Sequence, residues 1–344
     1  MRRATALDEG HRAKRHSPRS TESPAAEGPA GSTTDDSRRG RAATRENPVA
    51  REAVAGVTLS SPDKPDFPET GLTKLDLARY YESVAAWILP HLERRPLSLV
   101  RCPDGWSLQC FYQKHADPSV HEAVTRVEVP ENDGPATYFS ASTGAALVGL
   151  VQWGVIEMHP WGARSPRLDR PDRLTFDFDP DESLPWHTLV AAVRQLRELL
   201  AELHLTAFLK TTGGKGLHVV LPIRATLSWE VAKSFSRAVA DLLVRTTPDL
   251  FTANAAKASR KGRIFIDYLR NARGATAIAP YAVRARERGP VAMPIAWSEL
   301  ASDVRFAHFN LGNAARRLDR RTDPWADFLG THQVITVKMR ERLG

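Results

Sequence analysis

Two acidic residues alternate with bulky apolar residues in the segment 174–180, which reads LTFDFDP. This alternation predicts a β-strand, because successive side chains of a strand point to opposite faces. The apolar residues would face a core, while Asp177 and Asp179 would project together from the other face, roughly 6–7 Å apart. Carboxylates at such a spacing suit hard cations that prefer oxygen ligands. The competing interpretation is an ordinary strand end, since aspartates and Asp-Pro pairs are common in turns.

A second apolar segment, 263–268, carries the single acid Asp267. An isolated carboxylate within a sheet is unfavourable for stability, so this residue favours the functional interpretation. Three carboxylates on two strands predict a site for two Mg²⁺ or Mn²⁺ ions, which together activate an attacking oxygen and stabilise a leaving one. The reaction class that this chemistry implies is phosphoryl or nucleotidyl transfer.

A glycine-rich turn, KTTGGKGLH at 210–218, lies between two further expected strands. Backbone amides at Gly213 and Gly214 can approach a phosphate closely, and Lys215 and His218 can donate hydrogen bonds to it. The turn is not a Walker A loop, because the spacing differs and a strand follows it. Taken alone it fits a plain hairpin better, but beside a metal site it becomes a candidate cradle for a nucleoside triphosphate.

Basic side chains gather around Asp267, and a solvated surface is the usual explanation for such runs. Beside three carboxylates, binding of a triphosphate and of DNA phosphates by some of them explains the cluster better. The cluster comprises Lys257, Arg260, Lys261, Arg263, Arg270, Arg273, Arg284, Arg286 and Arg288.

Consecutive aromatic residues, Phe111 and Tyr112, precede Lys114 in the first half of the chain. On a strand we expect one ring to face the core and the other to face outward. The outward ring would either stack on a nucleobase, an interaction worth about 1–3 kcal/mol, or simply be a surface tyrosine. His159, held extended by the proline that follows it, is likewise either a structural residue or a substrate contact.

The 344 residues carry a net charge of +8, which suits a polyanionic partner without proving one. Only two cysteines occur, so we expect free thiols, a reducing cytosol and a cytoplasmic, nucleoid-associated protein. Cys102 and Cys110 match zinc-ligand spacing poorly even with His115 and His121. We also expect no membrane partner, because no apolar run is long enough to cross a bilayer.

Residues 1–54 hold few large apolar side chains and predict a disordered basic and polar tail. The folded domain is expected over 55–330, with a mainly β part at 55–160, a catalytic part at 161–300, a packing segment at 301–330 and a tail at 331–344. Thr73 and Asp76 predict a capped helix that ends at Pro90. Strands are expected at 97–101, 108–112, 125–129, 136–139, 174–180, 207–211, 217–221 and 263–268, and helices at 189–203 and 229–242.

Together these motifs closely resemble the polymerase domain of bacterial DNA ligase D, a member of the archaeo-eukaryotic primase superfamily that serves nonhomologous end joining. The resemblance runs from about 57 to 329. Its signatures are FPE at 67–69 with TK at 73–74, FYQK at 111–114, HPW at 159–161, DFDP at 177–180, GGKGLH at 213–218, DY at 267–268 and APYAVRAR at 279–286.

The resemblance implies an α/β (α+β mixed) fold in which an RRM-like catalytic half packs on a mainly β N-terminal half. It implies that Asp177, Asp179 and Asp267 are catalytic residues that bind Mn²⁺ or Mg²⁺. Contacts to the incoming nucleotide would come from His159, Thr212, Gly213, Gly214, Lys215, His218, Arg260, Arg270 and Arg284. DNA contacts would come from Lys64 and Lys74 at a 5′-phosphate, from Phe111 and Tyr112 at the template strand, and from Arg101 and Lys114.

Two positions depart from the family pattern. Thr212 stands where Ser is frequent, so we expect nucleotide affinity or sugar choice to differ, and Arg270 stands where Gln is frequent. No Lys-x-Asp-Gly adenylation motif occurs, so we expect a stand-alone polymerase without ligase activity. The expected activity is template-dependent, ribonucleotide-preferring gap filling and end extension, with a separate ATP-dependent DNA ligase and a Ku-like protein as partners. The alternatives are a primase that starts chains without a primer and a noncatalytic scaffold for DNA ends.

Overall fold

The computed structural model describes residues 52–300, 309–318 and 322–343, all of which belong to one compact unit, Pro48–Gly344. The predicted tail therefore lies outside the described residues up to position 51, as do 301–308, 319–321 and 344. Strand β1 (Glu52–Val54) pairs with β2 (Val57–Leu59), so the fold begins before the predicted boundary at 55. The hairpin forms because it buries Val54, Val57 and Leu59.

Helix α1 (Lys74–Ser83) starts at the predicted capping box. The Thr73 hydroxyl accepts from the Asp76 amide, and the Asp76 carboxylate accepts from the Thr73 amide at 2.8 Å. The predicted end at Pro90 was wrong, since this proline lies inside a second helix, α2 (Ala85–Leu92). A proline costs the helix one hydrogen bond, and burial of Ile88 and Leu92 outweighs that cost.

The N-terminal part contains a sheet in the order β6 (Phe111–Gln113), β5 (Leu97–Arg101), β8 (Gly134–Ser140) and β7 (Thr125–Glu131), with β9 (Val155–Pro160) also paired to β5. The expectation of a mainly β part missed helix α3 (Gly144–Gln152), which packs on α1. Every residue of α3 from Ala146 to Val151 is buried. Without a polar face, the helix shows no amphipathic period in the sequence.

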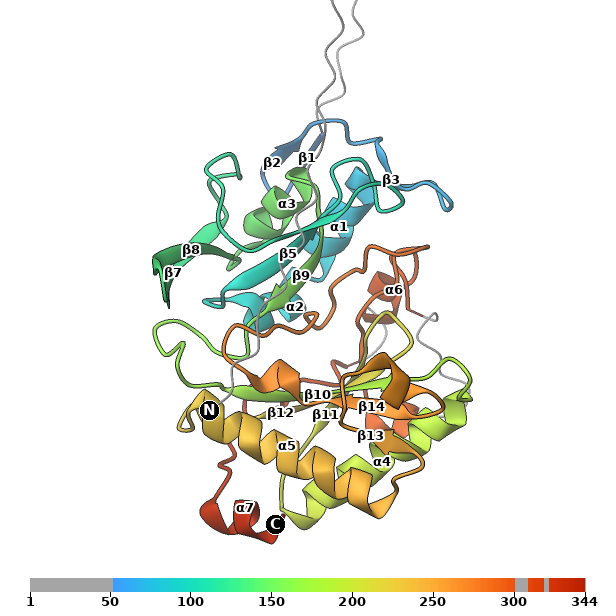
Figure 1. Ribbon diagram of the computed structural model, residues 1–344. Helices are drawn as coiled ribbons and strands as arrows, with labels where there is room; N and C mark the ends of the chain where they lie inside the picture. Colours follow the sequence, from blue (N-terminus) through green and yellow to red (C-terminus); the bar gives the residue numbers. More distant parts are fainter. Residues whose placement is uncertain (1–51, 301–308, 319–321, 344) are drawn as a thin grey trace, which may run out of the picture. The chain divides into compact units, whose positions relative to one another are not determined.

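The part that the sequence predicts to be catalytic, called the catalytic part below, has a β-α-β-β-α-β arrangement. It is built from β10 (Arg173–Pro180), α4 (Trp186–Glu202), β11 (Phe208–Thr211), β12 (Leu217–Pro222), α5 (Trp229–Thr246) and β14 (Ile264–Asp267). Its four strands lie antiparallel in the order β14-β10-β12-β11, with β13 (Phe251–Thr252) and β15 (Pro294–Ile295) at the edges. Helices α4 and α5 lie on the same face of this sheet (Figure 1). The apolar residues of β10 are fully buried, as the alternation predicted.

Hydrogen bonds join the N-terminal and catalytic parts through the segment that follows β14. The Tyr81 hydroxyl donates to the Ile156 carbonyl and accepts from the Val283 amide. The Ala279 amide donates to the Met158 carbonyl at 2.9 Å. Since both tyrosine contacts are buried, this segment fixes the strand that carries His159 against the catalytic sheet.

The predicted C-terminal tail at 331–344 packs on the catalytic part over its described residues. Gln333 exchanges two hydrogen bonds with the Thr206 backbone, and Ile335 and Leu343 are buried. The remaining elements are β3 (Pro65–Phe67), β4 (Leu72–Thr73), α6 (Ala314–Leu318), α7 (Val337–Arg342) and the 3₁₀ turns η1 (Lys257–Arg260), η2 (Leu269–Asn271) and η3 (Trp297–Glu299). Within the described ranges, no helix has the length and apolar character needed to cross a bilayer.

Cys102 and Cys110 form a disulfide, so the prediction of two free thiols was wrong. Cys102 follows β5 and Cys110 precedes β6, and the antiparallel pairing of these strands brings the two residues together. Because both sulfurs are in the disulfide, they are not available as thiolate ligands for zinc.

Candidate functional site

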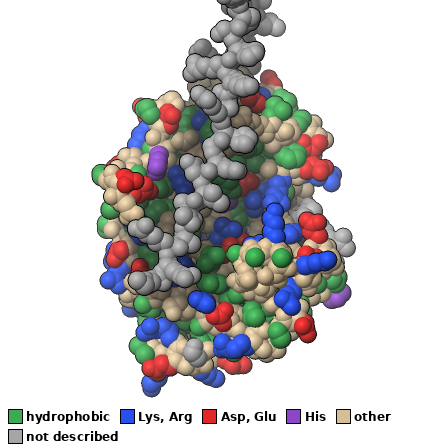
Figure 2. Space-filling model, viewed as in Figure 1, with side chains coloured by type: hydrophobic (Ala, Val, Ile, Leu, Met, Phe, Trp, Pro, Cys, Tyr) green, Lys and Arg blue, Asp and Glu red, His purple; other side chains and the backbone are tan. Residues whose placement is uncertain are grey.

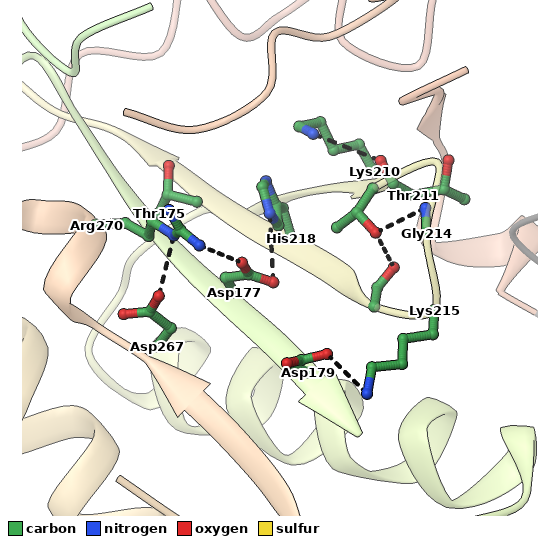
Figure 3. A network of polar contacts seen from close by, with 12 residues as sticks. Thr175, Asp177, Asp179, Lys210, Thr211, Gly214, Lys215, His218, Asp267 and Arg270 are labelled. Atoms are coloured by element: carbon green, nitrogen blue, oxygen red, sulfur yellow. Dashed lines mark hydrogen bonds and ion pairs between the residues drawn. The ribbon is translucent and has the colours of Figure 1, made fainter. Parts of the chain in front are cut away.

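The structure brings the three predicted carboxylates together on two neighbouring strands. Asp177 of β10 lies in register with Asp267 of β14 on one side and with His218 of β12 on the other. Asp179, two residues further along β10, projects from the same face of the strand (Figure 3). The acids therefore gather because antiparallel pairing places the end of β14 beside the end of β10.

Basic side chains contact each of these carboxylates. The Arg270 guanidinium spans two strands, with Nε 3.0 Å from an oxygen of Asp267 and Nη2 3.6 Å from an oxygen of Asp177 (Figure 3). Asp179 lies 3.5 Å from Lys215 Nζ and 3.4 Å from Arg260 Nη1. These cations offset the repulsion between neighbouring negative charges.

The pKa values of the two facing acids, Asp177 and Asp267, shift in opposite directions. Burial alone would raise the pKa of Asp177, but His218, Arg270 and Lys210 together lower it to about 2. Burial raises the pKa of Asp267 despite the nearby Arg270 charge. Burial also lowers the pKa of His218 to about 4, so at neutral pH this ring is uncharged and its Nε2 lies 3.4 Å from Asp177.

The donor chemistry of this cluster fits a divalent cation, because carboxylate oxygens are the ligands that Mg²⁺ and Mn²⁺ prefer. Among the described residues, however, no three His, Cys, Asp or Glu side chains converge closely enough to hold one ion. Arg270, Lys215 and Arg260 contact the carboxylate oxygens instead. Ion binding would therefore require these basic side chains to turn away from the acids.

A cavity of about 980 Å³ opens in front of the carboxylates. It collects most of the predicted nucleotide contacts and two of the predicted DNA contacts. Its lining includes Asp177, Asp179, Asp267, His159, Thr212, Gly214, Lys215, His218, Arg270, Arg284, Tyr112 and Lys114. The other predicted residues lie outside its lining, namely Gly213, Arg260, Lys64, Lys74, Arg101 and Phe111.

The turn between β11 and β12 depends on glycine at two positions. Gly213 has a φ of +66°, and a Cβ there would lie 2.6 Å from Arg284 Cγ. A Cβ on Gly216 would lie 2.5 Å from the Phe178 carbonyl oxygen. The Thr212 hydroxyl stabilises the turn, since it donates to the Gly216 carbonyl at 3.0 Å and accepts from the Gly214 amide at 3.2 Å.

Glu157 is a residue of this site that the sequence interpretation missed. It is buried on β9, and one carboxylate oxygen contacts both His159 Nε2 at 2.7 Å and Arg284 Nε at 2.9 Å. The other oxygen accepts from the Ala285 amide at 2.8 Å. Burial opposes ionisation of this group, but the His159 hydrogen bond and the Arg284 charge lower the pKa of Glu157 to about 2. An acid in a fully buried strand, two residues before His159, was the available signal.

Both rings of the aromatic pair are exposed, which corrects the expectation that one faces the core. Phe111 is 38% and Tyr112 is 71% exposed, because β6 is a three-residue edge strand. The Arg101 guanidinium lies 5.2 Å from the Phe111 ring and 3.5 Å from the Trp153 ring. An aromatic and cationic surface therefore borders the cavity on the side of Tyr112.

Lys64 and Lys74 lie close together at Asp66, apart from the carboxylate cavity. Lys64 Nζ is 2.8 Å from Asp66 and donates to the Pro103 carbonyl at 2.6 Å, while Lys74 Nζ donates to the Ser60 carbonyl at 2.8 Å. Burial and the Lys64 charge lower the pKa of Lys74. On the face shown in Figure 2, further Lys and Arg side chains gather near the middle, between the regions of β3 and α6.

The antiparallel sheet with facing carboxylates, a glycine turn and many basic groups defines a polymerase domain of the primase type. The family model described as LigD, primase-polymerase domain, matches residues 73–325. The chain belongs to this family.

The chain is 41% identical over 298 residues to the multifunctional non-homologous end joining protein LigD of Pseudomonas aeruginosa, covering 86% of this chain and 36% of that protein. It is 32% identical over 298 residues to the LigD of Mycolicibacterium smegmatis, covering 83% and 39%. The chain thus spans well under half the length of these relatives. Its structure matches the polymerase domain of Mycobacterium tuberculosis ligase D in complex with DNA, with a TM-score of 0.75, 32% identity, and 79% of this chain and 97% of that one covered.

Proposed function

We propose that this chain is a template-dependent nucleotidyltransferase that fills gaps and extends DNA ends during double-strand break repair by nonhomologous end joining. The observation that carries the proposal is one cavity whose lining includes Asp177, Asp179 and Asp267, residues of the glycine-rich turn and three arginines. The names of the similar proteins support the repair role, and the match to a polymerase domain in complex with DNA supports a DNA substrate.

Asp177, Asp179 and Asp267 would hold Mn²⁺ or Mg²⁺, which when bound lowers the pKa of a primer 3′-hydroxyl and stabilises the charge on the pyrophosphate leaving group. Lys215, Arg284 and Gly214 line the cavity and would bind the triphosphate. The chain supplies no nucleophile of its own, and its contribution is to position the reactants and balance their charge.

Sugar recognition would fall to His159 and Thr212, which both line the cavity. Burial lowers the pKa of His159, and a hydrogen bond between its Nε2 and the Glu157 carboxylate fixes the orientation of the ring. An uncharged, oriented imidazole can hydrogen-bond a ribose 2′-hydroxyl, an interaction that a deoxyribose cannot return. The proposal therefore includes a preference for ribonucleotides.

The DNA would contact the chain at two places. Tyr112 and Phe111 would stack on template bases, with Arg101 and Lys114 beside them, and Lys64 and Lys74 would bind the 5′-phosphate across the gap. A separate ATP-dependent ligase and a Ku-like end-binding protein are the proposed partners, at DNA ends in the nucleoid.

The test is extension of a primer across a gap bearing a downstream 5′-phosphate, with Mn²⁺ and either ribo- or deoxyribonucleotides. We expect templated products that increase with the phosphate and with ribonucleotides, and that disappear in Asp177→Ala. Arg237→Gln on the exposed side of α5 is the matched control. Tight phosphate-dependent binding without extension would indicate a scaffold instead, and synthesis without a primer would indicate a primase.

A further inference from the structure

A second cavity, of about 550 Å³, lies at the start of β10, whereas the catalytic carboxylates lie toward its end. Among the described residues that line it, five are arginines and Asp172 is the single carboxylate. The arginines are Arg95, Arg164, Arg167, Arg173 and Arg224. The positive charge of this cavity thus far exceeds its negative charge, and neither Arg95 nor Arg173 lines the carboxylate cavity.

One of these arginines, Arg95, pairs with both carboxylate oxygens of Asp172. Arg95 is completely buried and forms a bidentate ion pair with Asp172, at 2.8 Å from Nη1 to Oδ1 and 2.6 Å from Nη2 to Oδ2. Arg95 Nη1 also donates to the Trp161 carbonyl at 3.1 Å. This pair joins the residue before β10 to the segment between α2 and β5 and has an evident structural role.

The other buried guanidinium, that of Arg173, has no comparable partner. Its side chain is 8% exposed, its Nε is 3.7 Å from Asp172, and neither Nε nor Nη2 has a hydrogen-bond acceptor. Arg164 competes for the same acid, with Nε 3.2 Å from Asp172. Three guanidinium groups therefore share one carboxylate, although arginine stays protonated in proteins and buried unpaired N–H groups are costly.

The geometry points to a phosphate group as the missing partner, and we propose that this cavity is a phosphate-binding site beyond the catalytic one. A tetrahedral phosphate offers several oxygens, so it can accept from Arg173 and Arg164 together, whereas a carboxylate offers two. Phe328 forms an apolar wall, with its ring 5.3 Å from the Arg173 guanidinium.

The arginines continue from this cavity onto the surface. An adjoining cavity of about 210 Å³ shares Arg164, Arg167 and Asp172 with the first and adds Arg94 and Arg170. A continuous row of guanidinium groups favours a phosphate that belongs to a nucleic-acid strand, while the enclosed position of Arg173 also accepts free phosphate or pyrophosphate.

The test compares a double variant at exposed positions, a variant at a buried position and a control. Arg167 and Arg224 are exposed, and no side-chain hydrogen bond or ion pair of theirs is present among the described residues. The double variant Arg167→Gln with Arg224→Gln therefore reduces the charge of the cavity without breaking a contact. Arg173→Met removes the buried group, and Arg237→Gln on α5 serves as the control.

The first measurement is thermal unfolding in EDTA with inorganic phosphate or pyrophosphate, against chloride at equal ionic strength. We expect stabilisation of the wild type and of Arg237→Gln, a threefold or larger rise in the half-saturating concentration for the double variant, and a smaller shift in Arg173→Met than in the wild type. The second measurement is fluorescence anisotropy with a labelled single-stranded oligonucleotide, where a threefold or larger loss of affinity in the double variant would assign the site to strand phosphates.

A change in the first measurement alone would assign the site to free phosphate. If the double variant matched Arg237→Gln in both measurements, the proposal would be wrong, even if Arg173→Met failed to fold. Since neither measurement requires metal or primer extension, this outcome is separate from failure of the proposed polymerase activity.

Discussion

Arg270 contacts both Asp177 and Asp267, the two acids that face each other across the β10–β14 pairing. The guanidinium thus compensates a pair of carboxylates that the strand register forces together.

Replacing Arg270 should change cation binding directly. In Arg270→Gln the facing carboxylates lose a positive neighbour, so their combined charge attracts a divalent cation more strongly. We expect the Mn²⁺ dissociation constant to fall by about tenfold, equivalent to roughly 1.4 kcal/mol. Electron paramagnetic resonance of free Mn²⁺ in a titration measures this without nucleotide or DNA. Weaker Mn²⁺ binding than in Arg237→Gln would contradict the prediction.

The acids themselves should be indispensable for extension. Asp177→Asn and Asp267→Asn keep the shape of the side chain and remove its charge, and loss of an electrostatic contribution of several kcal/mol implies a decrease of about 10³-fold or more in the extension rate. Single-turnover extension measures the rate, and anisotropy with gapped DNA shows whether binding persists. Asp241→Asn, on the exposed side of α5, is the control, and an extension rate within tenfold of wild type in either site variant would remove the metal-site hypothesis.

Glu157→Gln should weaken nucleotide binding more than DNA binding. The amide can accept from one partner, but it cannot neutralise Arg284 while it orients His159. We expect KM for the nucleotide to rise by about tenfold and the preference for ribonucleotides to fall, since roughly one charged hydrogen bond is lost. Glu198→Gln on α4 is the control, and an unchanged ratio of ribo- to deoxyribonucleotide use would show that Glu157 does not position the sugar contact.

The same variant should reveal a defined pH dependence of stability. The pKa of Glu157 is about 2 in the folded protein and ordinarily about 4.5, so its stabilising effect is present above pH 4.5 and is lost as the pH falls toward 2. The shift corresponds to roughly 3 kcal/mol. Urea unfolding should show Glu157→Gln less stable than wild type by about this amount at pH 6, and the gap should narrow at pH 3. A difference in stability between the two proteins that increased as the pH fell would contradict this prediction.

Tyr112→Ala should reduce affinity for gapped DNA by about 1–3 kcal/mol if the exposed ring stacks on a template base. Tyr112→Phe keeps the ring and should bind nearly as well as wild type. Anisotropy titrations at fixed salt compare the two variants, and equal losses in both would assign the effect to the hydroxyl rather than to stacking.

The sequence predicted strand β10 well because Leu174, Phe176 and Phe178 are buried while Asp177 and Asp179 lie on the other face and are only partly buried. Helix α3 was missed because it is apolar on all sides, and the exposure of Phe111 depends on the edge position of β6, which local sequence does not reveal. The arginine cavity could not be predicted from the sequence either. Arg95 is distant in the chain from Arg164 and Arg173, and it meets them only when the fold is complete.

The disulfide between Cys102 and Cys110 closes a short loop that touches both proposed DNA contacts. One end of the loop leads into the strand of Phe111 and Tyr112, and its Pro103 carbonyl accepts from Lys64. The backbone of the loop also binds that of Asp66, through the Trp106 amide at 3.0 Å. The proposed template contacts and Lys64, a proposed 5′-phosphate contact, are therefore held by one loop that the disulfide closes, and this loop would set the distance between a templating base and the far side of a break.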